Sequence, residues 1–430
     1  MPDRLRDGAF GGKQSMISRR KVLTATAAGA AAAAAKAGQA ASFGNPDEPP
    51  QGAVNATNPA SITDPGPQNQ TLAGQFPAAQ SPPATDVGDL PQYWASFNNA
   101  PKRIQNGGWA RQVTQADFGI SETISGVNMR LTAGGIRELH WHLAAEWAYM
   151  TYGSCRITVL DDKGRAYVSD VKEGDLWYFP SGFPHSLQGL GPDGCEFVIC
   201  FDDGKATEFN TTLLTDWLAH TPPEILAENF GVPAGTFSKI PLQNRYIFQG
   251  QTPPALDVVK RAMEKPGDYP PYPFTFSLAS SAPVKKTKGG EVRVADSSNF
   301  NVSKTIAVGL VTIRPGALRE LHWHPNADEW AYWIKGKAQV TAFETGPKAV
   351  TLNFSPGDIG YVKRNNGHYV KNIGDTDLQY IEVFRSSYYA DISLSDWLTH
   401  SPPEMVAETL NIDVATIAKF PNNRPLVMPE

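Results

Sequence analysis

The sequence predicts a mainly β protein made of two tandem β-barrels, each followed by a small helical appendage. The chain has 430 residues, more than one domain usually holds. Its long motifs occur twice, and its apolar segments are short, rich in β-branched and aromatic residues, and separated by turn residues. Gly (38) and Pro (35) are abundant, which favours many short strands over long helices.

The internal repeat divides the chain into related halves. The hexapeptide Arg-Glu-Leu-His-Trp-His occurs at 137–142 and again at 319–324. A second segment, Asp-Trp-Leu-x-His-x-Pro-Pro-Glu, occurs at 216–224 and at 396–404. Because repeats of this length indicate duplicated units, we expect an N-terminal domain over 88–250 and a C-terminal domain over 271–425. The proline-rich stretch 251–270 is the expected interdomain linker.

Turn residues about ten positions apart separate the strand-like segments, a spacing typical of sandwiches and barrels. The clearest predicted strands are 155–160, 175–179 and 196–201, matched in the second half by 338–343, 358–362 and 380–384. The Asp-Trp-Leu segments differ, because Asp216 and Asp396 can each cap a helix. Pro-Pro-Glu then opens a second short helix, which gives each half its appendage.

The N-terminus resembles a targeting segment. Arg19 and Arg20 precede an apolar, alanine-rich run that ends in small residues near Ala41. This pattern predicts an export signal over 1–41, and the paired arginines resemble a twin-arginine signal, so a periplasmic or secreted location follows. A disordered alanine-rich tail is the alternative. The apolar run is too short to span a membrane, so we expect no membrane contact in the mature protein. Residues 42–87 are rich in Pro, Asn, Gln and Ala and are expected to be a linker.

Composition excludes several classes of function. The formal net charge is −5, and no Lys/Arg cluster suggests a nucleic-acid surface. The only cysteines, Cys155, Cys195 and Cys200, are too few for a disulfide framework. Buried free thiols are favoured over a Cys195–Cys200 bridge, because both residues fall in one strand-like apolar run.

Six of the eight histidines form two matched sets. Each set has a His-x-His pair, a glutamate shortly after it and a third histidine about 45 residues later. The sets are His140, His142, Glu146 and His185 in the first half, and His322, His324, Glu329 and His368 in the second. Residues two apart on a strand project from the same face, so each pair can bind one ion.

This ligand set suits particular metals. Three imidazoles and one carboxylate leave two positions of an octahedron open, which favours Mn²⁺ or Fe²⁺ over structural zinc. We expect two ions per chain. The remaining histidines, His220 and His400, lie in the appendages and are interpreted as packing or subunit-contact residues.

These motifs resemble those of the cupin family. The pattern Gly-x5-His-x-His-x3–4-Glu from Gly134 and from Gly316 is similar to the first cupin motif, and the segments from Gly174 to His185 and from Gly357 to His368 are similar to the second. The doubled Arg-Glu-Leu-His-Trp-His resembles bicupin oxalate decarboxylases. The resemblance implies jelly-roll cupin barrels, manganese and dioxygen as cofactors, conversion of oxalate to formate and CO₂, and a homo-oligomer, hexameric in that family.

The two halves differ in one loop. Phe201 lies 16 positions before Trp217, whereas Phe384 lies 13 before Trp397. The additional residues fall around 206–212 and predict a lid over the N-terminal site, although a solvent loop without a role is the alternative. The resemblance implies that Glu208 in this lid moves the proton. In the family's lid sequence, Asn stands where this chain has Phe209, which puts lid packing and rate in doubt.

Arginines and a second glutamate complete the predicted sites. Arg137 is expected to pair with a substrate carboxylate, but it can share the face of His140 only if the strand bulges; a surface salt bridge is the alternative. Glu382 stands where the N-terminal half has Ile199, and either relays a proton at the second metal or pairs with Arg319. Because only the first half has the additional loop with Glu208, we expect the main reaction at the N-terminal site.

Two other functions compete with the decarboxylase interpretation. The same site could oxidise oxalate to CO₂ and hydrogen peroxide, because the products depend on whether the lid delivers a proton. A metal-stabilised storage protein is the second alternative, and the intact ligand sets with Arg137 and Arg319 argue against it. Because manganese binds weakly in the Irving–Williams order, export after folding would let the sites load in the cytoplasm.

Overall fold

The computed structural model describes residues 69–76, 86, 90–263, 269–346 and 348–429. The expected export signal (1–41) lies outside these residues, as does most of the expected linker 42–87. Within that linker the structure describes α2 (Gln70–Gln75), which Asn69 caps through its side-chain oxygen. No helix among the described ranges is long and apolar enough to cross a membrane.

The N-terminal barrel is built around one long strand, β6 (Glu146–Leu160). The first half of β6 pairs with β8 and β10, and the second half pairs with β7 and β9, so that β6 runs through both walls of the barrel. The other strands are β2 (Arg103–Gln105), β3 (Gly108–Val113), β4 (Ser125–Leu131), β5 (Gly135–Trp141), β7 (Ala166–Lys172), β8 (Leu176–Phe179), β9 (His185–Gly189), β10 (Cys195–Phe201), β11 (Thr212–Leu213) and β12 (Ile247–Gln249).

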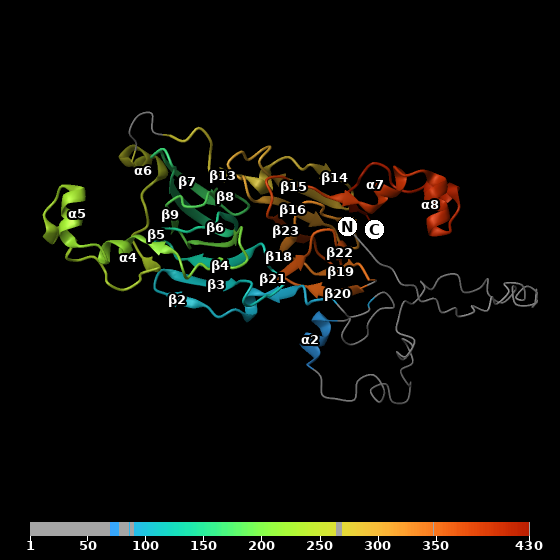
Figure 1. Ribbon diagram of the computed structural model, residues 1–430, viewed down its shortest axis with the longest axis horizontal. Helices are drawn as coiled ribbons and strands as arrows, with labels where there is room; N and C mark the ends of the chain where they lie inside the picture. Colours follow the sequence, from blue (N-terminus) through green and yellow to red (C-terminus); the bar gives the residue numbers. More distant parts are fainter. Residues whose placement is uncertain (1–68, 77–85, 87–89, 264–268, 347, 430) are drawn as a thin grey trace, which may run out of the picture. The chain divides into compact units, whose positions relative to one another are not determined.

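The C-terminal barrel repeats this arrangement with two separate sheets (Figure 1). One sheet has the order β1-β21-β18-β23-β16-β15-β14, and the other has the order β20-β19-β22-β17-β24 with β25 also on β17. The strands are β14 (Lys285–Lys286), β15 (Gly290–Ala295), β16 (Ala307–Ile313), β17 (Leu318–Trp323), β18 (Glu329–Lys335), β19 (Ala338–Glu344), β20 (Lys348–Phe354), β21 (Asp358–Val362), β22 (Gly367–Asn372), β23 (Leu378–Phe384), β24 (Ile392–Ser393) and β25 (Val427–Met428).

Each barrel is completed by a short strand from outside its own repeat. Strand β1 (Trp94–Ser96) precedes the N-terminal barrel in the chain but pairs with β21 of the C-terminal barrel. Strand β13 (Thr275–Phe276) precedes the C-terminal barrel but pairs with β8 of the N-terminal barrel. One buried cluster contains side chains of both barrels, among them Phe197 and Trp330, so the two barrels share part of their core.

The helical appendages follow the barrels, as the sequence predicts. They contain α4 (Leu214–Ala219) and α5 (Pro223–Phe230) in the first half, and α7 (Leu394–Thr399) and α8 (Pro403–Leu410) in the second. The expected capping by Asp216 and Asp396 is wrong. The chain turns directly from β11 or β24 into the helix, so Leu213 and Ser393 occupy the N-cap positions and both aspartates lie in the first turn.

The remaining elements are short. They are η1 (Phe97–Asn99), η2 (Ala234–Phe237), α6 (Leu256–Met263), η3 (Leu278–Ser280) and α9 (Val414–Ile417). All three cysteines are buried free thiols, as expected. Trp141 and Trp323 contact Trp217 and Trp397 of the appendages edge-on, with ring centroids 5.5 and 5.7 Å apart, and so pack each appendage against its barrel.

Candidate metal centres and active site

Each barrel brings its three histidines and one glutamate together. His140 comes from β5, His142 follows that strand, and Glu146 and His185 begin β6 and β9. The C-terminal set is arranged in the same way on β17, β18 and β22. Within each set, one possible ligand atom per residue lies within 4.8 Å of all the others. The structure therefore brings together the same two ligand sets that the sequence predicts.

A bulge places an arginine beside each set. The pairing of β5 with β9 shifts register between Arg137 and His140, and that of β17 with β22 shifts between Arg319 and His322. An unbroken strand would turn residues three apart to opposite faces, and the shift brings them to the same side. Both arginines are fully buried, which excludes the surface salt bridge considered for Arg137. The bulge that the sequence required is confirmed.

The histidine rings are oriented for metal binding. The Nδ1 atoms of all six lie within 3.1 Å of backbone carbonyl oxygens, such as Glu138 O for His140 (2.6 Å) and Ala390 O for His324 (2.8 Å). A proton on Nδ1 leaves the Nε2 lone pair free for a cation. The Nε2 atoms of His140 and His322 are buried without a hydrogen-bond partner among the described residues, and those of His324 and His185 lie 3.0 and 3.4 Å from carboxylate oxygens of Glu329 and Glu146. The donors therefore fit a bound divalent cation.

The ligands differ in their affinity for protons. Burial, helped by Arg137, holds the pKa of His140 well below its usual value, and His322 is lowered in the same way beside Arg319. Burial also lowers the pKa of His142, but the Glu146 carboxylate outweighs it and raises that pKa. Conversely, His185 and His142 hold the pKa of Glu146 far below its usual range despite burial. Each set therefore carries an ionised carboxylate, which attracts a cation.

The loop 206–212, which the sequence predicts to be a lid, packs against Arg137. Glu208 is 1% exposed, and one of its oxygens accepts a hydrogen bond from Arg137 Nε, while the other has no partner among the described residues. Arg137 also donates to Thr211 Oγ1 (2.9 Å) and lies 4.3 Å from the ring centre of Tyr246. Gln112 Oε1 anchors the lid by accepting from Glu208 N (3.1 Å) and Thr207 Oγ1 (2.9 Å).

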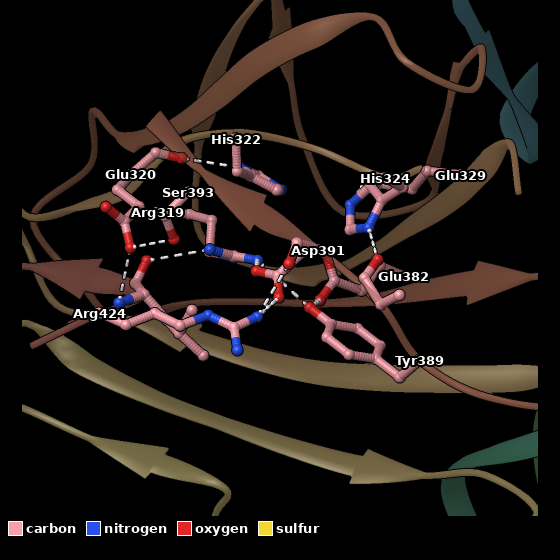
Figure 2. Close-up of polar contacts among 12 residues, drawn as sticks. Arg319, Glu320, His322, His324, Glu329, Glu382, Tyr389, Asp391, Ser393 and Arg424 are labelled. Carbon is pink, nitrogen blue, oxygen red and sulfur yellow. Dashed lines mark hydrogen bonds and ion pairs between the residues drawn. The ribbon is translucent and has the colours of Figure 1, made fainter. Parts of the chain in front are cut away.

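The C-terminal site holds its arginine differently (Figure 2). Arg319 Nη2 donates to Asp391 Oδ2 (2.5 Å), and Arg424 forms an ion pair with the other oxygen of the same carboxylate. Tyr389 bridges two groups, since its hydroxyl donates to Glu382 Oε1 (2.6 Å) and accepts from Arg319 Nη2 (3.2 Å). The direct Glu382–Arg319 ion pair considered from the sequence is therefore not the arrangement found, because Asp391 occupies that role.

Glu382 lies in space that a glycine leaves open. Gly309 is opposite Glu382 in the β16–β23 pairing, and a Cβ atom there would lie 2.5 Å from Glu382 Oε1. In the N-terminal barrel the matching pair is Val127 and Ile199, two apolar side chains. Burial, with the nearby Glu329 charge, raises the pKa of Glu382. Glu382 is fully buried, and its Oε2 atom has no partner among the described residues.

Several residues around the sites have no sequence signature. Tyr246 contacts Arg137 and Gln112 contacts the lid, whereas Tyr389, Asp391 and Arg424 surround Arg319. They come from distant segments and lie outside the repeated motifs. The one available signal was the alignment of Thr211 with Asp391 just before the short strands β11 and β24.

Two β-barrels that each hold three histidines and a glutamate define a metal-binding protein of the cupin class. The cupin family model matches residues 96–236 and 276–418, and the chain accordingly belongs to the cupin family.

Similar proteins narrow this assignment to the bicupin oxalate decarboxylases. Oxalate decarboxylase OxdC of Bacillus subtilis (strain 168) is 49% identical over 362 residues, covering 83% of this chain and 92% of that protein. A probable oxalate decarboxylase of Arthroderma benhamiae is 38% identical over 354 residues, covering 80% and 85%. A solved structure of the Bacillus subtilis enzyme, studied for its Mn(II) centres, superimposes with a TM-score of 0.82 at 47% identity, covering 85% of this chain and 96% of that one.

Proposed function

We propose that this protein is a manganese-dependent oxalate decarboxylase with its main site in the N-terminal barrel. The observation that carries the proposal is the buried ion pair between Arg137 and Glu208, which lies beside the ligand set His140, His142, Glu146 and His185. It combines a cation for the substrate carboxylate with a carboxylate that can accept and return a proton. The names of the two relatives support the choice of substrate, and the Mn(II) centres of the Bacillus subtilis enzyme support the choice of metal.

The counterions of Arg137 and Arg319 favour the N-terminal site as the place where oxalate binds. Glu208 belongs to a loop between β10 and β11, so opening of that loop removes the partner of Arg137. A buried arginine without a counterion is costly, and an entering oxalate carboxylate can replace the lost partner. Arg319 does not lose its counterion in this way, because Asp391 also pairs with Arg424, which holds it in place. Oxalate is therefore expected to bind at Arg137 in preference to Arg319.

The residues divide the reaction between them. The bound manganese, with dioxygen, supplies the one-electron chemistry that oxalate needs because it has no electron sink of its own. Arg137 holds and polarises one carboxylate. Glu208 takes the proton of hydrogen oxalate; the C–C bond then breaks with release of CO₂, and Glu208 returns the proton to the carbon that keeps the electron pair. Hydrogen oxalate thus yields formate and CO₂, and the proton is conserved.

The deciding experiment compares Glu208→Ala with a control, Glu224→Ala, on the exposed start of α5. Formate production should fall by at least about a hundredfold in Glu208→Ala, the usual contribution of a general acid–base group, with manganese content unchanged. Glu224→Ala should keep full activity. If Glu208→Ala formed formate at the parent rate, the lid assignment would be wrong.

Product analysis separates the decarboxylase from an oxidase. The unaltered enzyme should convert oxalate to formate with only a minor share of hydrogen peroxide, and removal of dioxygen should stop formate production. Peroxide as the main product would show that the site is an oxalate oxidase. Unchanged turnover without dioxygen would exclude dioxygen as a cofactor.

Export and assembly complete the proposal. We propose that residues 1–41 direct export of the folded, metal-loaded protein through a twin-arginine route to the periplasm or the medium. We also propose a homo-oligomer, hexameric by resemblance to the family. Export with Arg19 and Arg20 replaced by lysine should fail, and normal export of that variant would contradict the route.

A further inference from the structure

The lid carries an aromatic side chain next to its glutamate. Phe209 follows Glu208, and its ring lies 5.7 Å from the ring of Tyr246 in an edge-on arrangement. Tyr246 is almost fully buried and belongs to the segment just before β12, so it is part of the fixed wall of the site. Phe209 therefore docks the lid on the barrel, although the residue as a whole remains 36% exposed.

A cation from another strand lies over the same pair of rings. Arg103 in β2 places its guanidinium carbon 4.2 Å from the ring centre of Tyr246 and 5.6 Å from that of Phe209. Arg103 Nη2 also donates to Asn244 Oδ1 at 3.4 Å. A guanidinium within about 6 Å of a ring face is attracted by the ring quadrupole. Arg103 thus contacts one fixed ring and one ring that moves with the lid.

These contacts connect the outer surface of the lid to Arg137. Tyr246 lies under Arg103 and also 4.3 Å from the guanidinium carbon of Arg137, which pairs with Glu208. Any movement of Phe209 away from Tyr246 displaces its neighbour Glu208. The ring contacts and the buried ion pair therefore form or break together.

We propose that Arg103, Tyr246 and Phe209 form a latch that holds the lid closed, and that Arg103 is a positioning residue which favours decarboxylation over oxidation. The consequence for products rests on the proposed function. Phe209, which differs from the family's lid sequence, then strengthens closure and does not loosen it. Arg103 itself touches neither substrate nor metal in this assignment and acts only through Phe209 and Tyr246.

The latch has a kinetic signature that simple destabilisation lacks. Oxalate needs Arg137, which Glu208 occupies while the lid is closed, so a weaker latch raises the fraction of chains able to bind substrate. The KM for oxalate should therefore fall. A weaker latch also leaves the lid open more often during turnover, so kcat for formate should fall and the peroxide share should rise.

The test uses the full-length, manganese-loaded protein and three latch variants. Arg103→Ala and Phe209→Ser remove one side of the latch each, whereas Phe209→Trp keeps an aromatic ring. Arg130→Ala is the matched control, because it removes another arginine–aromatic contact of the same barrel, 4.8 Å from Tyr152 and outside the site. Hydrogen exchange of the backbone amides over 205–213 is measured without oxalate, followed by KM, kcat and the formate-to-peroxide ratio.

Arg103→Ala and Phe209→Ser should speed exchange of the lid amides about three- to tenfold, the scale of one cation–ring or ring–ring contact, and lower the formate-to-peroxide ratio. Phe209→Trp and Arg130→Ala should behave like the parent. Unchanged lid exchange in Arg103→Ala would overturn the latch. Faster exchange with unchanged products and KM would overturn its role in positioning. A parent that makes no formate would refute the proposed function, while the exchange result would still decide the latch.

Discussion

At the scale of single residues, the paired histidine and glutamate of each site link metal binding to pH. The carboxylates of Glu146 and Glu329 outweigh burial and raise the pKa of His142 and His324. In the metal-free chain each pair of a protonated histidine and its carboxylate contributes stability that is fully present below the unfolded histidine pKa of about 6.5. That stabilisation is lost as pH rises through the folded pKa. Binding of manganese has the opposite dependence, because the ion needs the neutral ring.

Manganese binding should therefore release protons. On the acid side of the raised pKa we expect binding to release protons and the affinity for manganese to rise with pH, with both effects vanishing at pH values above that pKa. Titration calorimetry in two buffers of different ionisation enthalpy measures the number released. His140 and His322 should contribute nothing, because burial already keeps them neutral. Binding without proton release near pH 6.5 would contradict this prediction.

A second prediction concerns the buried counterion of the C-terminal arginine. Asp391→Asn leaves Arg319, which is fully buried, without a negative partner. Loss of one member of a buried pair costs about 3–5 kcal/mol. Thr211→Ala is the matched control, because Thr211 is the equivalent residue of the N-terminal repeat and carries no charge. This substitution should lower the free energy of unfolding by about 1 kcal/mol. Denaturant unfolding of the metal-free proteins gives both values.

The pH dependence of that cost has a defined sign. Burial raises the pKa of Asp391, but Arg319 and Arg424 outweigh it and lower the pKa below its usual value. The stability contributed by Asp391 is therefore fully present above about pH 4 and is lost as pH falls through the lower folded pKa. The deficit of Asp391→Asn should be constant above pH 4 and shrink below it. A deficit that grows on acidification would be inconsistent with the ion pair.

At the scale of elements, the sequence predicted the barrel strands and the ligand sets well. The expected strand 358–362 is β21 itself, and 155–160 is the second half of β6. Strand periodicity and the repeat were sufficient here, because both are local patterns in the chain. The bulge between Arg137 and His140 also followed from sequence, since only a register shift lets both face one site.

Contacts set by the fold could not be predicted in the same way. Tyr389 and Asp391 lie 70 and 72 positions from Arg319, and apart from the alignment of Asp391 with Thr211 nothing in the sequence marks them as its partners. Arg103 and Phe209 meet only because β2 and the lid converge on Tyr246. The prediction that Asp216 caps a helix was wrong for a related reason, because the position of β11 fixes where α4 begins.

The exchange of short strands between barrels gives a third prediction. Tyr93, just before β1, is buried in the core of the C-terminal barrel, and its hydroxyl lies 2.8 Å from the carbonyl oxygens of Val340 and Val350. Tyr93→Ala should therefore destabilise the C-terminal barrel by about 3–5 kcal/mol, although the residue precedes the N-terminal barrel. Tyr93→Phe, which removes only the hydroxyl, should cost about 1 kcal/mol.

Hydrogen exchange locates the damage of Tyr93→Ala. Amides of β18 and β21 should lose protection first, before those of β4 and β10, and the C-terminal site should lose its manganese before the N-terminal site. Earlier exchange in β4 would show that the segment before β1 supports the N-terminal barrel instead.

At the scale of the whole molecule, the two copies have diverged inside and stayed alike outside. Inside, the two sites differ in the counterion of the buried arginine, which is Glu208 of a loop in one copy and Asp391, also paired with Arg424, in the other. Outside, apolar side chains are exposed at equivalent positions of both copies, to similar extents. These pairs are Leu139 and Leu321 (51% and 49%), Trp217 and Trp397 (59% and 58%), Ile225 and Met405 (53% and 53%), and Phe230 and Leu410 (55% and 45%).

A single exposed apolar residue needs no explanation, whereas we expect a set that is repeated in both copies to be the surface that a second copy of the chain covers in the proposed homo-oligomer. Because the two appendages are alike, one chain can present its first appendage to the second appendage of a neighbour and so close a ring.

Light scattering during gel filtration should therefore give a mass that is a multiple of the 46.6 kDa chain. The double variant Ile225→Asp with Met405→Asp should dissociate towards single chains, since charge in a buried apolar contact is costly. Val284→Asp, at another apolar residue that is 57% exposed, should leave the assembly intact. A parent that runs as a single chain would contradict the proposed assembly, and equal dissociation by Val284→Asp would show that the appendages are not its interface.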